Sequence, residues 1–143
     1  MKRSILFIAI ILLSGLQLAS AQALRGRNGA WIGAIESSGV IRDSQNRYTG
    51  KIDSDGIIRN SSNAQIGKLQ SDGIVRDKNN AQIGKIQPDG IVRDKNNAQI
   101  GRIQPDGIVR DKNNAQIGSA KGVKPEWAAV AFFFFFDLGL NNN

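Results

Sequence analysis

A glycine that returns every 17 residues constrains the fold of this chain more than any other feature of its sequence. The residues between the glycines repeat as well, since Ile83–Gln99 recurs with one change as Ile100–Gln116. A fixed internal period indicates copies of one supersecondary unit, each of which buries its apolar face only by packing on its neighbours. Five full units fit between the first and the last of these glycines, which are Gly33, Gly50, Gly67, Gly84, Gly101 and Gly118.

Each unit contains two turn signals and two short β-prone runs. Gln87–Gly90 has Pro and Asp at its central positions and Gly after them, which is typical of a type I turn followed by a left-handed glycine. Asp94–Asn97 is the second turn, and it ends in an Asn, which tolerates the left-handed region. Ile91–Arg93 and Ala98–Ile103 are the two runs, with β-branched residues typical of strands. We therefore expect each unit to form two strands and two turns, and five units to form about ten strands.

A row of hairpins leaves two exposed edge strands unless the row closes. We therefore expect an all-β fold in which five tandem 17-residue β-hairpin repeats, over residues 31–118, close into a pseudo-five-fold ring. The Pro-Asp-Gly turns favour hairpins over the alternative, an open β-solenoid with one unit per coil. Ile83 and Ile86 are three residues apart, so we expect a β-bulge at Gly84 to turn both inward.

The repeats, the basic and apolar N-terminus and the apolar C-terminal segment together resemble the 5-fold β-flower family of secreted bacterial β-repeat proteins. The resemblance covers nearly the whole chain after residue 21 and rests on units such as Ile83–Asp94, Ile-Gly-Lys-Ile-x-x-Asp-Gly-Ile-Val-Arg-Asp. The first unit departs from the pattern, with Ala34 in place of Lys and Ser38 in place of Asp. The resemblance implies a five-fold hairpin assembly and implies no particular activity.

The N-terminus predicts export. Lys2 and Arg3 precede an apolar run over residues 5–18, and Ala-Ser-Ala at residues 19–21 is a small-residue cleavage site. We expect residues 1–21 to be a signal peptide, which places the protein in the periplasm, on the outer surface or outside the cell. Cleavage lowers the net charge from +7 to +5, and the chain contains no cysteine for a disulfide. Residues 22–30 are expected to be a polar lead-in, and Trp31 an anchor at the open end of the array.

Residues 119–143 are expected to form an apolar C-terminal cap segment. Its apolar run is too short to span a bilayer, because a spanning helix needs roughly 20 residues. Three interpretations stay open: a buried plug at one end of the ring, an exposed patch that contacts a membrane or a partner, and an aggregation-prone tail. We favour the plug, because the chain has few other aromatic residues to fill a core. The candidate residues are Trp127, Phe132, Phe133, Phe134, Phe135 and Phe136.

The composition argues against an enzyme. The chain contains neither histidine nor cysteine, so the most common general base and the thiol nucleophile are absent. Asp53 and Asp55 are interpreted as turn residues rather than as a glycosidase pair. Asp94 and Asn96 resemble the start of a calcium loop, but the later ligands are missing, so we interpret them as a solvated turn. No catalytic residue, metal site or cofactor is predicted.

An arginine recurs at one position in every unit and is the sharpest pattern left for binding. In a closed ring these guanidinium groups would form a circle able to bind phosphate, sulfate or carboxylate groups. The competing interpretation, which we favour, pairs each Arg with a neighbouring Asp. Few aromatic residues accompany the charges, so the sequence carries no specific nucleic-acid signal. The candidate anion-binding residues are Arg42, Arg59, Arg76, Arg93 and Arg110.

The sequence therefore predicts an exported, non-enzymatic structural or interaction module of the bacterial cell envelope. One alternative is an anion- or glycan-binding module that uses the arginines, with an anionic polymer, a glycan or another envelope protein as partner. A second alternative is a membrane-associated or oligomer-forming protein that uses the phenylalanine-rich segment.

Overall fold

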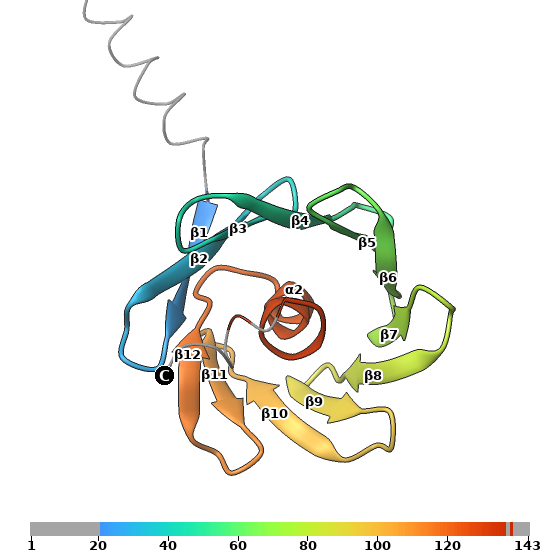
Figure 1. The fold of residues 1–143 in the computed structure, drawn as a ribbon. Coiled ribbons are helices and arrows are strands. Elements are labelled where there is room, and N and C mark those ends of the chain that lie inside the picture. The colour runs from blue at the N-terminus through green and yellow to red at the C-terminus, as the bar shows by residue number, and fades with distance from the viewer. Residues whose placement is uncertain (1–20, 137, 139–143) are drawn as a thin grey trace, which may run out of the picture.

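The computed structural model describes residues 21–136 and 138, and they form a closed antiparallel β-barrel around one short helical segment (Figure 1). The signal peptide expected at residues 1–21 lies outside these residues except for Ala21. Every neighbouring pair of strands is antiparallel, and β1 pairs with both β2 and β12. The strands are β1 (Ala21–Gly26), β2 (Trp31–Glu36), β3 (Val40–Asp43), β4 (Tyr48–Ile52), β5 (Ile57–Asn60), β6 (Gln65–Leu69), β7 (Ile74–Asp77), β8 (Gln82–Ile86), β9 (Ile91–Asp94), β10 (Gln99–Ile103), β11 (Ile108–Asp111) and β12 (Gln116–Ser119).

Closure of the barrel rules out the open β-solenoid. The ring has twelve strands, two more than the ten expected. The additional pair is β12 with β1, which joins the two ends of the strand array. Residues 22–30 thus contain a wall strand where a polar lead-in is expected. Leu24 is fully buried and is the one large apolar side chain of this strand, which is too weak a periodic signal to recognise in the sequence.

The two turns of each unit have the backbone that their residues favour. Gly90 has φ 91°, and its N–H donates to the Gln87 carbonyl at 2.9 Å. Asn97 has φ 66° at the equivalent place in the second turn. Asp94 Oδ1 accepts the N–H groups of Asn96 and Ala98 at 2.9 and 3.0 Å, so this carboxylate replaces backbone partners inside the turn. Both turns therefore connect adjacent strands as tight hairpins.

The expected bulge is present, one residue before the glycine. Arg76 is opposite Gln82 and Val75 is opposite Gly84, so Ile83 is the extra residue. Ile86 is consequently buried, whereas Ile83 is half-buried and packs against the edge of the core. The centre of the core comes from the second residue of each short strand, which is fully buried: Ile41, Ile58, Val75, Val92 and Val109.

One helical segment lies inside the ring (Figure 1). Helix α2 (Pro125–Ala129) begins with a proline, which suits the first helical turn, and continues as the π-helix η1 (Val130–Phe134). Residues 128–132, Ala-Ala-Val-Ala-Phe, are fully buried, and small side chains let the helix fit within the barrel. In the described part of the chain no helix is both long and apolar enough to cross a membrane.

Candidate functional site

The recurring arginines lie on the outer wall of the barrel. In β9 the buried Val92 points inward, so Arg93, next along the strand, faces outward. Each guanidinium makes two bonds of the same kind: Nε donates to the side chain six residues earlier, and Nη1 donates to the carbonyl four residues later. For Arg59 these are Asp53 Oδ2 at 2.9 Å and the Asn63 carbonyl at 3.2 Å. The five arginines are therefore held in one orientation relative to the strands.

The partner of Nε changes along the chain. Arg42 and Arg59 pair with carboxylates, Glu36 at 2.6 Å and Asp53 at 2.9 Å. In the next three units the partner is a neutral amide instead: Arg76 binds Gln70, Arg93 binds Gln87, and Arg110 binds Gln104. The positive charge is thus balanced in the first two units and left unbalanced by this bond in the last three.

The interpretation that each Arg pairs with a neighbouring Asp holds for Arg59, which binds Asp53, and is wrong as a rule for the repeat. Asp55, Asp72, Asp89 and Asp106 each accept the backbone N–H two residues later, at 3.1 to 3.2 Å. This bond holds the carboxylate within its own turn.

Further cations face these arginines across the strands. Lys51 is directly opposite Arg59, where Asp53 binds both cations at 3.8 and 2.9 Å. In the next three units no carboxylate of the described residues is bound between the facing cations: Lys68 is opposite Arg76, Lys85 opposite Arg93, and Arg102 opposite Arg110. Like charges directly opposite each other destabilise a sheet, so this arrangement costs the fold stability. Residues 65–118 hold nine Lys and Arg against six Asp, whereas residues 31–64 hold four of each sign. We call these six residues the cationic wall: Lys68, Arg76, Lys85, Arg93, Arg102 and Arg110.

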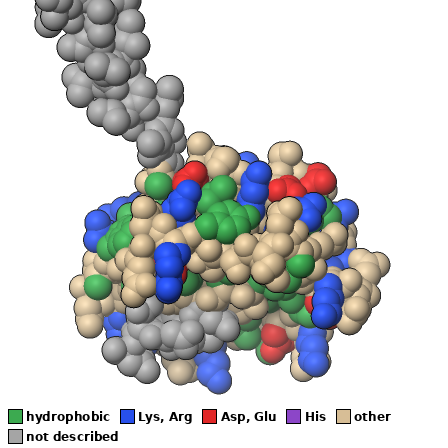
Figure 2. All heavy atoms as spheres, turned by 45° about the horizontal axis from the view of Figure 1, so that its top comes forward, with side chains coloured by type: hydrophobic (Ala, Val, Ile, Leu, Met, Phe, Trp, Pro, Cys, Tyr) green, Lys and Arg blue, Asp and Glu red, His purple; other side chains and the backbone are tan. Residues whose placement is uncertain are grey.

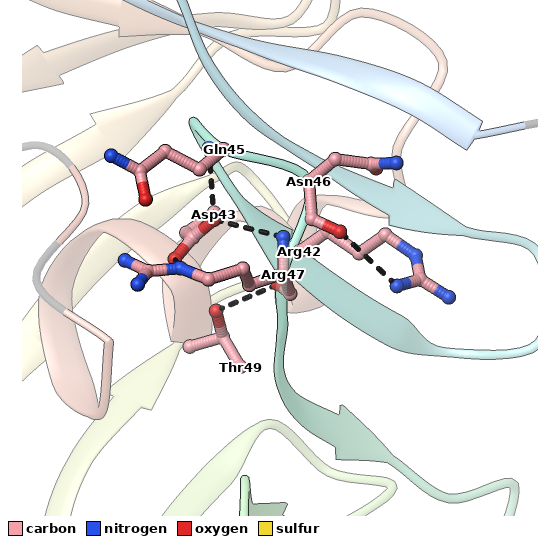
Figure 3. A network of polar contacts seen from close by, with 6 residues as sticks. All are labelled: Arg42, Asp43, Gln45, Asn46, Arg47 and Thr49. Carbon is pink, nitrogen blue, oxygen red and sulfur yellow. Dashed lines mark hydrogen bonds and ion pairs between the residues drawn. The ribbon is translucent and has the colours of Figure 1, made fainter.

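Figure 2 shows Lys and Arg side chains spaced around the outside of the barrel, and Figure 3 shows the contrasting first unit, in which charges are paired. Asp43 Oδ1 accepts the N–H groups of Gln45 and Arg47 at 2.9 and 3.0 Å, and Oδ2 accepts Arg47 Nε at 2.9 Å. The Arg47 backbone N–H lowers the pKa of Asp43 most; desolvation is the next largest effect and opposes it, and the Gln45 N–H and the Arg47 side chain lower the pKa further. The first unit therefore carries paired charges and lies outside the cationic wall.

Inside the barrel the phenylalanine run meets the repeat glycines. Consecutive rings lie against consecutive units in reverse order: Phe132 at Gly118, Phe133 at Gly101, Phe134 at Gly84, Phe135 at Gly67 and Phe136 at Gly50. A β-carbon at position 101 would lie 2.5 Å from Phe133 Cε1, so the ring occupies space that only glycine leaves. Gly33 differs, because the three atoms nearest to its β-carbon position are all backbone atoms.

The π-helix helps to distribute these rings. In an α-helix, side chains four residues apart lie on the same face. Phe132 and Phe136 instead contact Gly118 and Gly50, which belong to different units on either side of Gly33. A π-helical turn is wider than an α-helical turn, so each residue rotates by a smaller angle about the helix axis. The hydrogen bond from the Phe135 N–H to the Val130 carbonyl, at 3.3 Å, closes this wider turn. The sequence offered one signal for this contact, the equal number of phenylalanines in the run and of repeat units.

Trp127, the remaining candidate, is half-buried where the helix begins. Lys124 Nζ lies 4.7 Å from the centre of its ring, a cation–π contact. Among the described residues, no group of three or more Asp or Glu side chains could hold a metal ion.

The barrel and the phenylalanine run together span the same residues as a match to a known protein family. The family model of the 5-fold β-flower proteins matches residues 21–136, from the first strand to the last phenylalanine. The chain belongs to the 5-fold β-flower family. No curated protein and no solved structure matches it significantly. Both the outer wall and the Phe–Gly contacts lie within the β-flower match.

Proposed function

We propose that this protein is an exported, non-enzymatic interaction module of the bacterial cell envelope, and that its cationic wall binds an anionic polymer. The observation that carries the proposal is the set of three cross-strand cation pairs, Lys68–Arg76, Lys85–Arg93 and Arg102–Arg110. A sheet that places like charges directly opposite each other is relieved when an anion lies between or over them.

The geometry of the wall suits a repeating ligand. Equivalent cation pairs recur every second strand, about 10 Å apart along the wall. An extended polymer with regularly spaced carboxylate or sulfate groups can therefore contact successive pairs. Nε and Nη1 already hold each guanidinium in place, as Arg93 shows with Gln87 and the Asn97 carbonyl. Less conformational entropy is then lost on binding, and further N–H donors of the group stay available for the polymer.

We further propose that the five 17-residue units act as one pseudo-five-fold structure with the phenylalanine-rich segment as its plug. The Phe–Gly contacts support this, since five of the six repeat glycines contact a ring. Phe132 is fully buried, and the four rings after it are half-buried against the core. Burial of these rings favours a plug over a patch that inserts into a membrane or drives oligomerisation.

Binding of heparin and polygalacturonate to the full chain, measured by calorimetry at low and moderate salt, tests the cationic wall. The variant Lys68→Gln/Lys85→Gln/Arg102→Gln removes one cation from each pair. The matched control Arg27→Gln/Arg47→Gln/Lys121→Gln removes the same charge outside the wall. We expect the wall variant to lose at least about fivefold in affinity, from roughly 0.3–1 kcal/mol per exposed contact, and wild-type affinity to fall with salt.

Equal losses in the two variants would show that only net charge matters, and no binding at low salt would also overturn the proposal. Neutral dextran serves as the polymer control. A melting temperature raised by the polyanion in the wild type, and not in the wall variant, would support the site independently by linkage.

A further inference from the structure

A groove of about 640 Å³ opens at the end of the barrel where helix α2 begins. The glycine turns of the first three units line one side of it together with Gln87 and Pro88 of the fourth, and Lys124, Glu126 and Trp127 line the other. Its volume lies within the ~300–1,000 Å³ typical of small-ligand sites. The residues that line the groove include none from the turn of the fifth unit, Gln104–Gly107. The groove therefore follows the first four turns and stops short of the fifth.

The repeats differ from one another where they meet this groove. The second turn position is serine in the first three units, Ser37, Ser54 and Ser71, and proline in the last two, Pro88 and Pro105. The five turns have the same backbone, with glycine φ between 90° and 94°. Proline is favoured at this position and typically stabilises a compatible turn by about 0.4–1 kcal/mol. Pro88 also lines the groove, so a proline turn fits there. The serines of the first three turns give up this stability and place hydroxyl groups along the groove, which indicates a role other than folding.

The groups around the groove are those that recognise sugars. Ser54 and Ser71 supply hydroxyls that donate and accept, Gln70 a planar amide, and Asp55 and Asp72 carboxylates. Trp127 supplies a flat apolar surface on the opposite side, large enough to pack against the C–H face of a sugar ring. We propose that this groove binds a short neutral glycan, with Trp127 as the stacking surface and the turn serines and carboxylates as hydroxyl partners.

The charges of the groove separate this site from the cationic wall. Asp53, Asp55, Asp72 and Glu126 line it against the single cation Lys124, which disfavours an acidic ligand. The carboxylates are also engaged in the fold: Asp53 binds Arg59 at 2.9 Å, and Asp55 accepts the Ile57 N–H at 3.1 Å. Their remaining acceptor capacity allows them to accept hydrogen bonds from the hydroxyl groups of a neutral ligand. The glycan site is therefore independent of polyanion binding.

The test is a titration of the full chain with four oligosaccharides, in which calorimetry and tryptophan fluorescence detect binding. The four are maltohexaose, cellohexaose, xylohexaose and N-acetylchitohexaose. The key variant is Ser54→Pro/Ser71→Pro, which copies the turns of the last two units and should keep or raise the melting temperature. We expect at least one oligosaccharide to bind, and this variant and Trp127→Ala to weaken it tenfold or more. Pro105→Ser, the reverse change in a turn outside the groove, should leave the affinity unchanged.

Three outcomes would overturn the proposal. One is that none of the four oligosaccharides binds at millimolar concentration. Another is equal affinity of the wild type and Ser54→Pro/Ser71→Pro. The third is that oligolysine, included as a cationic competitor, binds the groove and is lost in that variant while the oligosaccharides do not bind.

Discussion

Replacing Gly101 by alanine tests whether the phenylalanine rings are the reason that the repeat position is glycine. A β-carbon there would lie 2.5 Å from Phe133 Cε1 and 2.7 Å from the Arg110 carbonyl oxygen. Carbon atoms in contact stay ~3.5–4.0 Å apart, so the ring or the strand must move by about 1 Å. Overpacking of this kind typically costs about 1–3 kcal/mol.

Gly33 provides the matched control, because it occupies the same position of the first unit without a ring. A β-carbon at Gly33 meets the Arg42 carbonyl, as one at Gly101 meets that of Arg110. We therefore expect Gly101→Ala to lower the free energy of unfolding by about 1–3 kcal/mol more than Gly33→Ala does. The melting temperature should fall further by roughly 3–6 °C per kcal/mol for a chain of this size.

The assay is urea unfolding of the full chain followed by circular dichroism, with Phe133→Ala completing a double-mutant cycle. Removing the ring should relieve the clash, so the double variant should be more stable than the sum of the single changes by about 1–2 kcal/mol. Gly33→Ala should add to Phe133→Ala without such coupling. Equal effects of Gly101→Ala and Gly33→Ala, or simple additivity in the cycle, would refute the argument that the rings select glycine.

Two further predictions concern the first unit and the closing strand. The lowered pKa of Asp43 gives stability that is complete above its ordinary value near 3.8 and lost as pH falls through the lower folded value. Asp43→Asn should therefore flatten the acid limb of a stability–pH curve while keeping the turn, because Asn60 makes the same two backbone bonds naturally; an unchanged limb would contradict this. Leu24→Ala should cost about 2–5 kcal/mol in urea unfolding if β1 closes the barrel, and a loss below about 1 kcal/mol would exclude Leu24 from the core.

The period and the turn residues were sufficient to predict an all-β hairpin fold. Asn97 has the left-handed backbone that its recurrence implied, and Gly90 likewise. β1 escaped prediction because a strand held by the single side chain of Leu24 has no periodic signature. Gly84 marked the bulge that interrupts the alternation of inward and outward residues, but the extra residue is Ile83, so Ile83 is half-buried where both isoleucines of β8 were expected to point inward.

The candidate sites could likewise be predicted only in part from the sequence. The arginine positions followed from the period, but the partners of the last three did not, because the aspartates on both sides of each Arg are held within turns, as Asp89 and Asp94 are beside Arg93. The glutamines that replace acids in the last three units are visible in the sequence, yet their meaning requires the pairing of Gln87 with Arg93 across a turn. The groove likewise depends on where the helix begins within the ring, which no local pattern specifies.

The pairing of β1 with β12 sets the order in which this protein can become complete. Gly26 lies opposite Gly118, so β1, the first strand in the chain, can complete its pairing only after β12, the last strand, has been made. Near-identical units meanwhile allow a strand to pair one unit out of place at little energetic cost, because each offers the same partner. Each of the five phenylalanine rings packs on one repeat glycine. A barrel with one unit too few or too many would leave a phenylalanine or a glycine without its partner, so the run favours the correct number of units. The C-terminal segment thus selects the pairing register of the strands that precede it in the chain.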